Sequence, residues 1–165
     1  MTSAGGFATD ADRAFLERAV ALATENVAAG GGPFGALVVS ADGVVIGEGQ
    51  NRVTRDLDPS AHAEVVAIRD ACANLRTFQL TDCELYTSCE PCPMCLSAIY
   101  WARVPQVYFA NTRQDAADIG FDDDFIYRQI PLPLELRAIK INPLLREEGL
   151  ATFKAWATKQ DKVRY

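Results

Sequence analysis

The chain has 165 residues and a net charge of −6, from 22 acidic and 16 basic side chains, and this length suits a single domain. No apolar run approaches the length of a membrane span, and no Lys/Arg cluster marks a surface for a phosphate backbone, so we expect neither a membrane nor a nucleic-acid partner. Residues 1–6 lack the basic and apolar regions of a signal peptide, and five cysteines suit metal binding in a reducing compartment, so we expect a cytoplasmic protein.

The first predicted elements are a helix and a hairpin. Thr9 or Asp10 can cap the helix. Its apolar residues recur at helical spacing: Phe15, Leu16, Ala19, Val20, Ala23 and Val27. We expect the three glycines at 30–32 to end this helix. They do not fit a phosphate-binding loop, because the lysine and the spacing of that motif are missing. Residues 34–40 and 44–49 are predicted to form two strands of a hairpin.

The middle of the chain alternates between helices and strands. A helix is predicted over residues 61–75, which places His62 and Glu64 in its first turn. Residues 83–88 and 107–110 have the character of strands, with a cysteine-rich loop and a helix between them. This alternation predicts that the later strands are parallel and that helices cover both faces of the sheet.

The C-terminal part is first polar and then amphipathic. Residues 111–124 are polar, and residues 135–141 are predicted to form a late strand. Pro143 fits the start of a last helix with apolar residues Leu145, Leu150, Phe153 and Trp156. We therefore expect an α/β fold over residues 1–165, a three-layer α/β/α sandwich with a mixed five-stranded sheet.

One histidine and two closely spaced cysteines predict a metal site. Cys92 and Cys95, at the start of a helix, can converge on one ion, and His62 is the only histidine available as a third ligand. Three protein ligands are typical of a catalytic zinc, which keeps one position for water. Glu64 can move protons between that water and a leaving amino group. The arrangement H-x-E…P-C-x-x-C is the known signature of zinc-dependent deaminases.

The same cysteines leave other interpretations open. A C-x-x-C pair alone is also compatible with a structural zinc knuckle or a redox pair. Cys89 extends the pair to C-x-x-C-x-x-C, as at the start of an iron–sulfur ligand run, but Ile99 stands where a fourth cysteine would be expected. Cys89 is also placed to act as a fourth zinc ligand, which would give a closed site. A structural zinc-binding module without catalysis is therefore the non-enzymatic alternative.

Further motifs carry a resemblance that covers most of residues 8–165. They are His62-Ala63-Glu64, Tyr86-Thr87-Ser88-Cys89-Glu90-Pro91, Pro91-Cys92-Pro93-Met94-Cys95-Leu96, Ala98-Ile99-Tyr100-Trp101-Ala102-Arg103, Asp115-Ala116-Ala117, Gly120-Phe121-Asp122-Asp123 and Tyr165. In these motifs the chain resembles the bacterial guanine deaminase branch of the cytidine-deaminase-like superfamily. Ser97 departs from the glycine common in that branch, and we expect only a small packing change from it.

The resemblance implies an enzyme of purine catabolism that converts guanine to xanthine and ammonia. It implies that Zn²⁺ is bound by His62, Cys92 and Cys95, and that Glu64 shuttles protons. It also implies a set of residues around the purine, with the last two along its faces: Asn51, Ala63, Asp123, Tyr165, Phe34 and Trp101. Enzymes of this branch are homodimers with an exchanged C-terminal segment, so the resemblance implies that residues 143–165 are exchanged with a partner subunit.

Other substrates with the same chemistry remain open. They are adenosine in tRNA, cytosine and an aminotriazine such as ammeline. Deaminases that act on tRNA adenosine share the metal motif, but typically carry smaller residues than Pro93 and Leu96-Ser97. They also lack the Gly-Phe-Asp-Asp motif and the terminal tyrosine. We therefore expect a free nucleobase, guanine, as the substrate.

Overall fold

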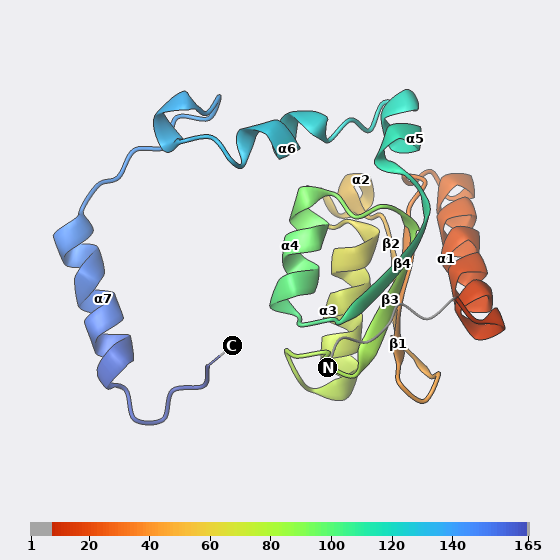
Figure 1. Cartoon of the computed structure of the whole chain (residues 1–165), viewed down its shortest axis with the longest axis horizontal. Helices are drawn as coiled ribbons and strands as arrows, with labels where there is room; N and C mark the ends of the chain where they lie inside the picture. The colour runs from red at the N-terminus through yellow and green to blue at the C-terminus, as the bar shows by residue number, and fades with distance from the viewer. Residues whose placement is uncertain (1–7, 165) are drawn as a thin grey trace. The chain divides into compact units, whose positions relative to one another are not determined.

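The computed structural model describes residues 8–164, and Figure 1 shows the ribbon. The chain divides into two compact units, Met1–Asp123 and Asp124–Tyr165. No helix among residues 8–164 is both long enough and apolar enough to span a membrane. The expectation of one domain over the whole chain stays a prediction.

The first unit is built on a four-stranded sheet with the strand order β2-β1-β3-β4. β1 (Gly35–Ser40) is antiparallel to β2 (Val45–Gln50) and to β3 (Cys83–Cys89). β4 (Gln106–Asn111) is parallel to β3. The sheet is therefore mixed, and the prediction of an antiparallel opening hairpin followed by parallel strands is confirmed.

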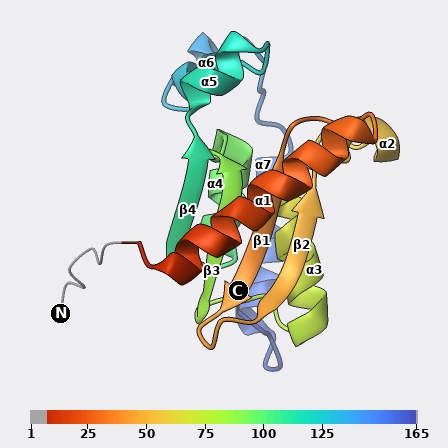
Figure 2. The ribbon, with the colours of Figure 1, turned by 90° about the vertical axis from the view of Figure 1, so that its right-hand side faces the viewer.

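Helices cover both faces of this sheet, with α1 (Asp10–Ala28) on one face and α3 (Ala63–Leu75) with α4 (Pro93–Trp101) on the other (Figures 1 and 2). Side chains alternate along β1, because successive residues of a strand point to opposite faces. Leu37 and Val39 pack in the α1 layer, whereas Ala36 and Val38 pack against α3. The predicted three-layer α/β/α sandwich is therefore confirmed.

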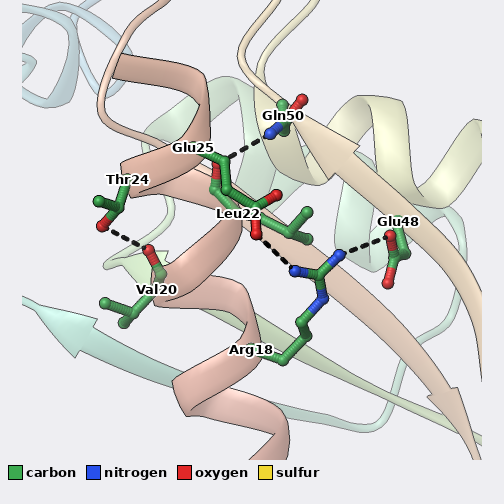
Figure 3. Close-up of polar contacts among 7 residues, drawn as sticks. All are labelled: Arg18, Val20, Leu22, Thr24, Glu25, Glu48 and Gln50. Carbon is green, nitrogen blue, oxygen red and sulfur yellow. Dashed lines mark hydrogen bonds and ion pairs between the residues drawn. The ribbon is translucent and has the colours of Figure 1, made fainter. Parts of the chain in front are cut away.

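α1 begins at a capping box and is held to β2 by polar contacts. The Thr9 side chain accepts from Asp12 N, and the Asp12 carboxylate accepts from Thr9 N, which confirms Thr9 as the cap. Gln50 Nε2 donates to Leu22 O at 2.9 Å, and Arg18 pairs with carboxylates of α1 and β2 (Figure 3). The buried face of the helix consists of Ala19, Leu22, Ala23 and Asn26.

α3 packs very closely on β2 through small residues. A Cβ at Gly49 would lie 2.0 Å from the carbonyl oxygen of Ala63, and a Cβ at Gly47 would lie 2.5 Å from that of Ala67. Ala63 and Ala67 are fully buried. Helix and strand backbones therefore almost touch, and this contact determines where the N-terminus of α3 lies.

Two short helices, α2 (Val53–Asp56) and α5 (Arg113–Asp118), complete the first unit. The second unit contains α6 (Asp124–Gln129), a 3₁₀ helix η1 (Leu134–Leu136) and α7 (Arg146–Thr158). The predicted last helix is confirmed, with its start three residues after Pro143. None of these three helices contains a buried residue, and Phe153 of α7 is 73% exposed.

The prediction of a fifth strand at residues 135–141 is wrong, since the sheet in the described residues has four strands. Arg137 donates from Nε to Leu132 O and from Nη2 to Ile130 O, both at 2.9 Å. Ala138 N donates to Gln129 Oε1 at 2.7 Å. The backbone N–H of Ala138 is therefore bonded to a side chain and not to a neighbouring strand.

Gly49→Ala should destabilise the first unit by at least about 2 kcal/mol, because the new methyl group meets backbone atoms of α3 that no rotamer change can move. Urea unfolding measures this loss. Glu48→Ala, at the exposed neighbouring position, is the control and should change stability by less than about 1 kcal/mol. Equal stability of Gly49→Ala and the unmodified chain would contradict the close packing.

Candidate metal centre

Two helix N-termini bring the predicted metal ligands together. His62 is the N-cap residue of α3, Cys92 is the N-cap residue of α4, and Cys95 lies in the first turn of α4. His62 Nδ1 lies 3.5 Å from Cys92 Sγ and 3.5 Å from Cys95 Sγ. All three ligand atoms lie within 4.8 Å of one another, and residues 8–164 contain no second group of this kind.

This geometry fits zinc. Zinc bonds of about 2.3 Å to sulfur and about 2.0 Å to nitrogen, at a tetrahedral angle, put sulfur and nitrogen about 3.6 Å apart. The two observed separations of 3.5 Å match that value with no movement of the helices. Two thiolates and one imidazole are also a typical donor set for zinc.

The charges of the three ligands favour a cation. A hydrogen bond from Cys95, with a further contribution from His62, lowers the pKa of Cys92 to about 4. The same bond to Cys92 raises the pKa of Cys95, because the two sulfurs share a proton. The hydrogen bond to Cys92 also raises the pKa of His62. The lowered pKa of Cys92 therefore favours its thiolate form, which is the form that binds a metal ion.

Glu64 lies beside the three ligands and is almost fully buried. Its carboxyl group is in the first turn of α3, 6% exposed, and its Oε2 accepts from Cys95 Sγ at 3.4 Å. Burial raises the pKa of Glu64. Glu64 therefore lies beside the three ligands in an environment that favours the protonated form of its carboxyl group more than water does.

Cys89 is not part of the ligand group. Its Sγ donates to Thr112 O at 3.6 Å, and burial raises its pKa to about 11. A thiol that is protonated and bonded to a backbone carbonyl is a poor metal ligand, because the ligand is the thiolate. The geometry therefore favours a site with three protein ligands over a closed site or an iron–sulfur cluster.

Of the residues predicted around the substrate, Asn51, Phe34 and Ala63 lie on neighbouring segments. Asn51 follows β2, and its N–H donates to Phe34 O, just before β1, at 3.1 Å. Asn51 Oδ1 accepts from Val53 N at 3.3 Å. Ala63 is fully buried between His62 and Glu64 in the sequence. The Phe34 ring meets the Phe121 ring edge-on, with centroids 5.0 Å apart.

Asp123 is the last residue of the first unit and is half-buried. Desolvation raises the pKa of Asp123, and the negative charge of Cys92 raises it further. Phe121, which touches Phe34, lies two residues earlier in the chain. The Gly-Phe-Asp-Asp motif therefore contacts the segment of Phe34 through Phe121.

The structure does not bring Trp101 to the metal group. Trp101 is the last residue of α4 and is 67% exposed. It lies six residues after Cys95, which corresponds to about 9 Å along the helix. Tyr165 lies outside the described residues. The roles of both residues stay predictions.

Sequence reasoning missed two polar residues that hold the loops around Asn51. Ser88 Oγ accepts from Gly35 N at 3.1 Å, and Asn26 Nδ2 donates to Asn51 O at 2.9 Å. Asn26 could have been found, because it continues the helical spacing of Ala19, Leu22 and Ala23 on the buried face. A polar side chain on such a face needs a hydrogen-bond partner.

Comparison with known proteins agrees with this geometry. The family described as the cytidine and deoxycytidylate deaminase zinc-binding region matches residues 9–111. The chain is 57% identical to the guanine deaminase of Bacillus subtilis over 152 residues, 92% of this chain and 97% of that protein. It is 35% identical to the tRNA-specific adenosine deaminase of Haemophilus influenzae, over 69% of this chain and 68% of that protein.

Solved structures give the same result. The X-ray structure of the guanine deaminase from Bacillus subtilis superposes with a TM-score of 0.90 at 56% identity, over 93% of this chain and 98% of that one. A structure of the guanine deaminase from Nitrosomonas europaea superposes with a TM-score of 0.66 at 34% identity, over 90% of this chain and 85% of that one.

His62→Ala should lose the metal, because residues 8–164 hold no other group that could replace it. Glu64→Gln should keep about one zinc per chain, since the carboxyl group is not among the three ligands. Elemental analysis measures the zinc content. Thermal unfolding with and without a chelator measures the stability that bound metal adds to the folded state.

Cys72→Ala is a matched control for Cys92→Ala, because Cys72 is a half-buried cysteine outside the ligand group. The control should bind zinc like the unmodified chain. Full zinc occupancy in His62→Ala or in Cys92→Ala would contradict the assignment of ligands.

Proposed function

The chain belongs to the cytidine and deoxycytidylate deaminase family, and we propose that it is a zinc-dependent hydrolase that converts guanine to xanthine and ammonia. The observation that carries this proposal is the buried carboxyl group of Glu64 beside three converging metal ligands. The high identity to a guanine deaminase over nearly its whole length supports guanine as the substrate.

The reaction exchanges the 2-amino group of guanine for an oxygen atom from water. Zinc held by His62, Cys92 and Cys95 would lower the pKa of a water molecule towards neutrality. Glu64 takes one proton from water and delivers one to the amino nitrogen, so that the C–N bond breaks and ammonia leaves. Proton transfer by a positioned carboxyl group contributes roughly 10²–10⁴-fold to such rates.

Asp123 and Asn51 provide different hydrogen-bonding groups for the base. The Asp123 carboxylate accepts from N–H groups of guanine, whereas the Asn51 amide both donates and accepts. The proposal for Asp123 is supported by the effect of the Cys92 charge on its pKa, which indicates that the two side chains are near each other. Phe34 and Ala63 border the base, and Tyr165 and Trp101 are proposed to cover it. Adenine lacks the N–H pattern that a carboxylate binds.

The second candidate is adenosine deamination in tRNA, which the similarity to tRNA-specific adenosine deaminases favours. The net charge of −6 counts against it, because nucleic-acid binding depends on contacts between basic side chains and phosphates. Cytosine and aminotriazines such as ammeline remain further substrates for the same chemistry. We propose guanine degradation in the cytoplasm as the physiological setting.

We also propose that the enzyme is a homodimer in which residues 143–165 are exchanged between subunits. The second unit supports this proposal, because none of its helices has a buried residue within its own chain. Its exposed apolar side chains include Ile139, Leu144, Phe153 and Trp156. We propose that a partner subunit covers these side chains. β4 and the far end of α4 are also exposed.

The substrate assignment is tested by the release of ammonia from a panel of compounds. Guanine should be turned over by the zinc-loaded chain much faster than adenine, cytosine, ammeline, guanosine and a tRNA anticodon stem-loop. Glu64→Gln is the control for contaminating activity and should lose at least about 100-fold. An inert guanine with rapid turnover of the stem-loop would establish the second candidate instead.

Asp123→Ala should reduce kcat/KM for guanine by about 10- to 100-fold, the effect of losing a hydrogen bond to a charged group. Zinc content should not change, because Asp123 is not a ligand. Asp122→Ala, the adjacent acid, is the matched control and should keep near-normal kinetics. If only Asp122→Ala loses activity, Asp122 is the residue that contacts the base.

Deletion of residues 161–165 should leave zinc content and helix content unchanged and should sharply reduce guanine turnover, because Tyr165 no longer excludes water from the base. Mixing this truncated chain with Glu64→Gln chains should restore part of the activity, since an intact tail then meets an intact metal site. No recovery after proven subunit exchange would contradict exchange of the tail.

A further inference from the structure

We propose that Asn26 is a positioning residue for guanine binding, and that it acts by holding the backbone of Asn51 against the Gly31–Gly32 bend. This proposal rests on the proposed function, in which Asn51 contacts the base. Asn26 itself does not belong to the metal group or to the predicted substrate contacts.

Asn26 lies in the last turns of α1 and is 7% exposed. Its side-chain nitrogen has two hydrogens, and both are used. Nδ2 donates to Gly32 O at 2.8 Å and to Asn51 O at 2.9 Å. One amide group therefore joins two loops that lie on either side of the β1–β2 hairpin in the sequence.

These two bonds close a ring of hydrogen bonds that includes Phe34 and Asn51, two of the residues predicted to contact the base. Phe34 N donates to Gly32 O at 2.9 Å, and Asn51 N donates to Phe34 O at 3.1 Å. Asn26 thus binds two carbonyl groups of this ring. The backbone of Asn51 is held through both its N–H and its C=O, so the direction of its side chain depends on Asn26.

The glycines of the bend leave room for this arrangement. A Cβ at Gly31 would lie 2.4 Å from Asn26 Nδ2, and a Cβ at Gly32 would lie 3.2 Å from the side chain of Asn51. Neither glycine has a positive φ, so neither is needed for its backbone conformation. The sequence interpretation of this bend as a helix stop is therefore incomplete, because these two glycines also allow close approach of the two asparagines.

The interaction requires an amide. An aspartate at position 26 has the same shape but only acceptor oxygens, and it would face two backbone carbonyls. Asn26→Asp should therefore push the Asn51 loop away without changing side-chain volume. Asn26→Ala should leave two carbonyl groups without a partner.

The test uses the zinc-loaded full chain with guanine. Asn26→Asp should raise KM about 10-fold and change kcat by less than about 3-fold, because a misplaced binding residue weakens the bound substrate and the transition state alike. Asn74→Asp is the matched control, since Asn74 Nδ2 also donates to a backbone carbonyl of β2, that of Ile46, at 2.8 Å. The control should keep normal kinetics. An unchanged KM in Asn26→Asp would overturn the proposal.

A second pair of variants covers the case in which Asn26→Asp folds poorly. Gly31→Ala should raise KM by displacing the Asn26 amide, and this effect should disappear in an Asn26→Ala background, where the methyl group has room. Multiplicative effects in the Asn26→Ala/Gly31→Ala double variant would show that the glycine acts independently of Asn26, which would overturn the proposal.

A readout without substrate separates this proposal from the proposed function. In NMR spectra of the zinc-loaded chain, the side-chain amide signal of Asn51 should shift in Asn26→Asp and stay in place in Asn74→Asp. A shift in Asn26→Asp together with no ammonia release from guanine by the unmodified chain would sustain the positioning of Asn51 and refute guanine as the substrate. An Asn51 signal unmoved in Asn26→Asp would overturn the positioning role whatever the substrate.

Discussion

For this chain to hold a metal, two helix starts must bring His62 Nδ1 within about 3.5 Å of the sulfur atoms of Cys92 and Cys95, and the rest of the site depends on that approach. His62 is placed by α3, and α3 is placed by backbone contact with the glycines of β2. The cysteines are placed by α4, which starts after the central strand β3. Larger side chains at Gly47 or Gly49 would hold α3 away from the sheet. Small residues in the fold are therefore a condition for the chemistry at its edge.

The same approach determines the charges around the metal. Cys92 carries a thiolate, and burial raises the pKa values of its neighbours Glu64 and Asp123. A cation is favoured at the three ligands, because it offsets the negative charge of Cys92. Burial raises the pKa of the Glu64 carboxyl group relative to that of an exposed one, because low polarity disfavours the charged form. The site therefore depends on exclusion of water as much as on the ligands themselves.

The sequence predicted those parts of the structure that local signals determine. Three predicted features depend on residues close together in the chain, and all three are found. They are the Thr9 cap, the alternation of strands with helices, and the spacing of Cys92 and Cys95 at the start of a helix. The strand predicted at 135–141 failed because alternation of apolar residues does not reveal whether a partner strand is available. Asn26 was missed because the helical pattern was defined by apolar residues alone. Val20 and Val27 were included in that pattern, but their side chains are 39% and 52% exposed.

X-ray absorption at zinc in the full chain tests whether three protein ligands leave one position open beside Glu64. We expect two sulfur atoms at about 2.3 Å and two lighter atoms at about 2.0 Å, one of them from imidazole. Cys89→Ser should give the same spectrum, because Cys89 binds a backbone carbonyl instead. A third sulfur that disappears in Cys89→Ser would contradict the account and identify a closed, structural zinc site.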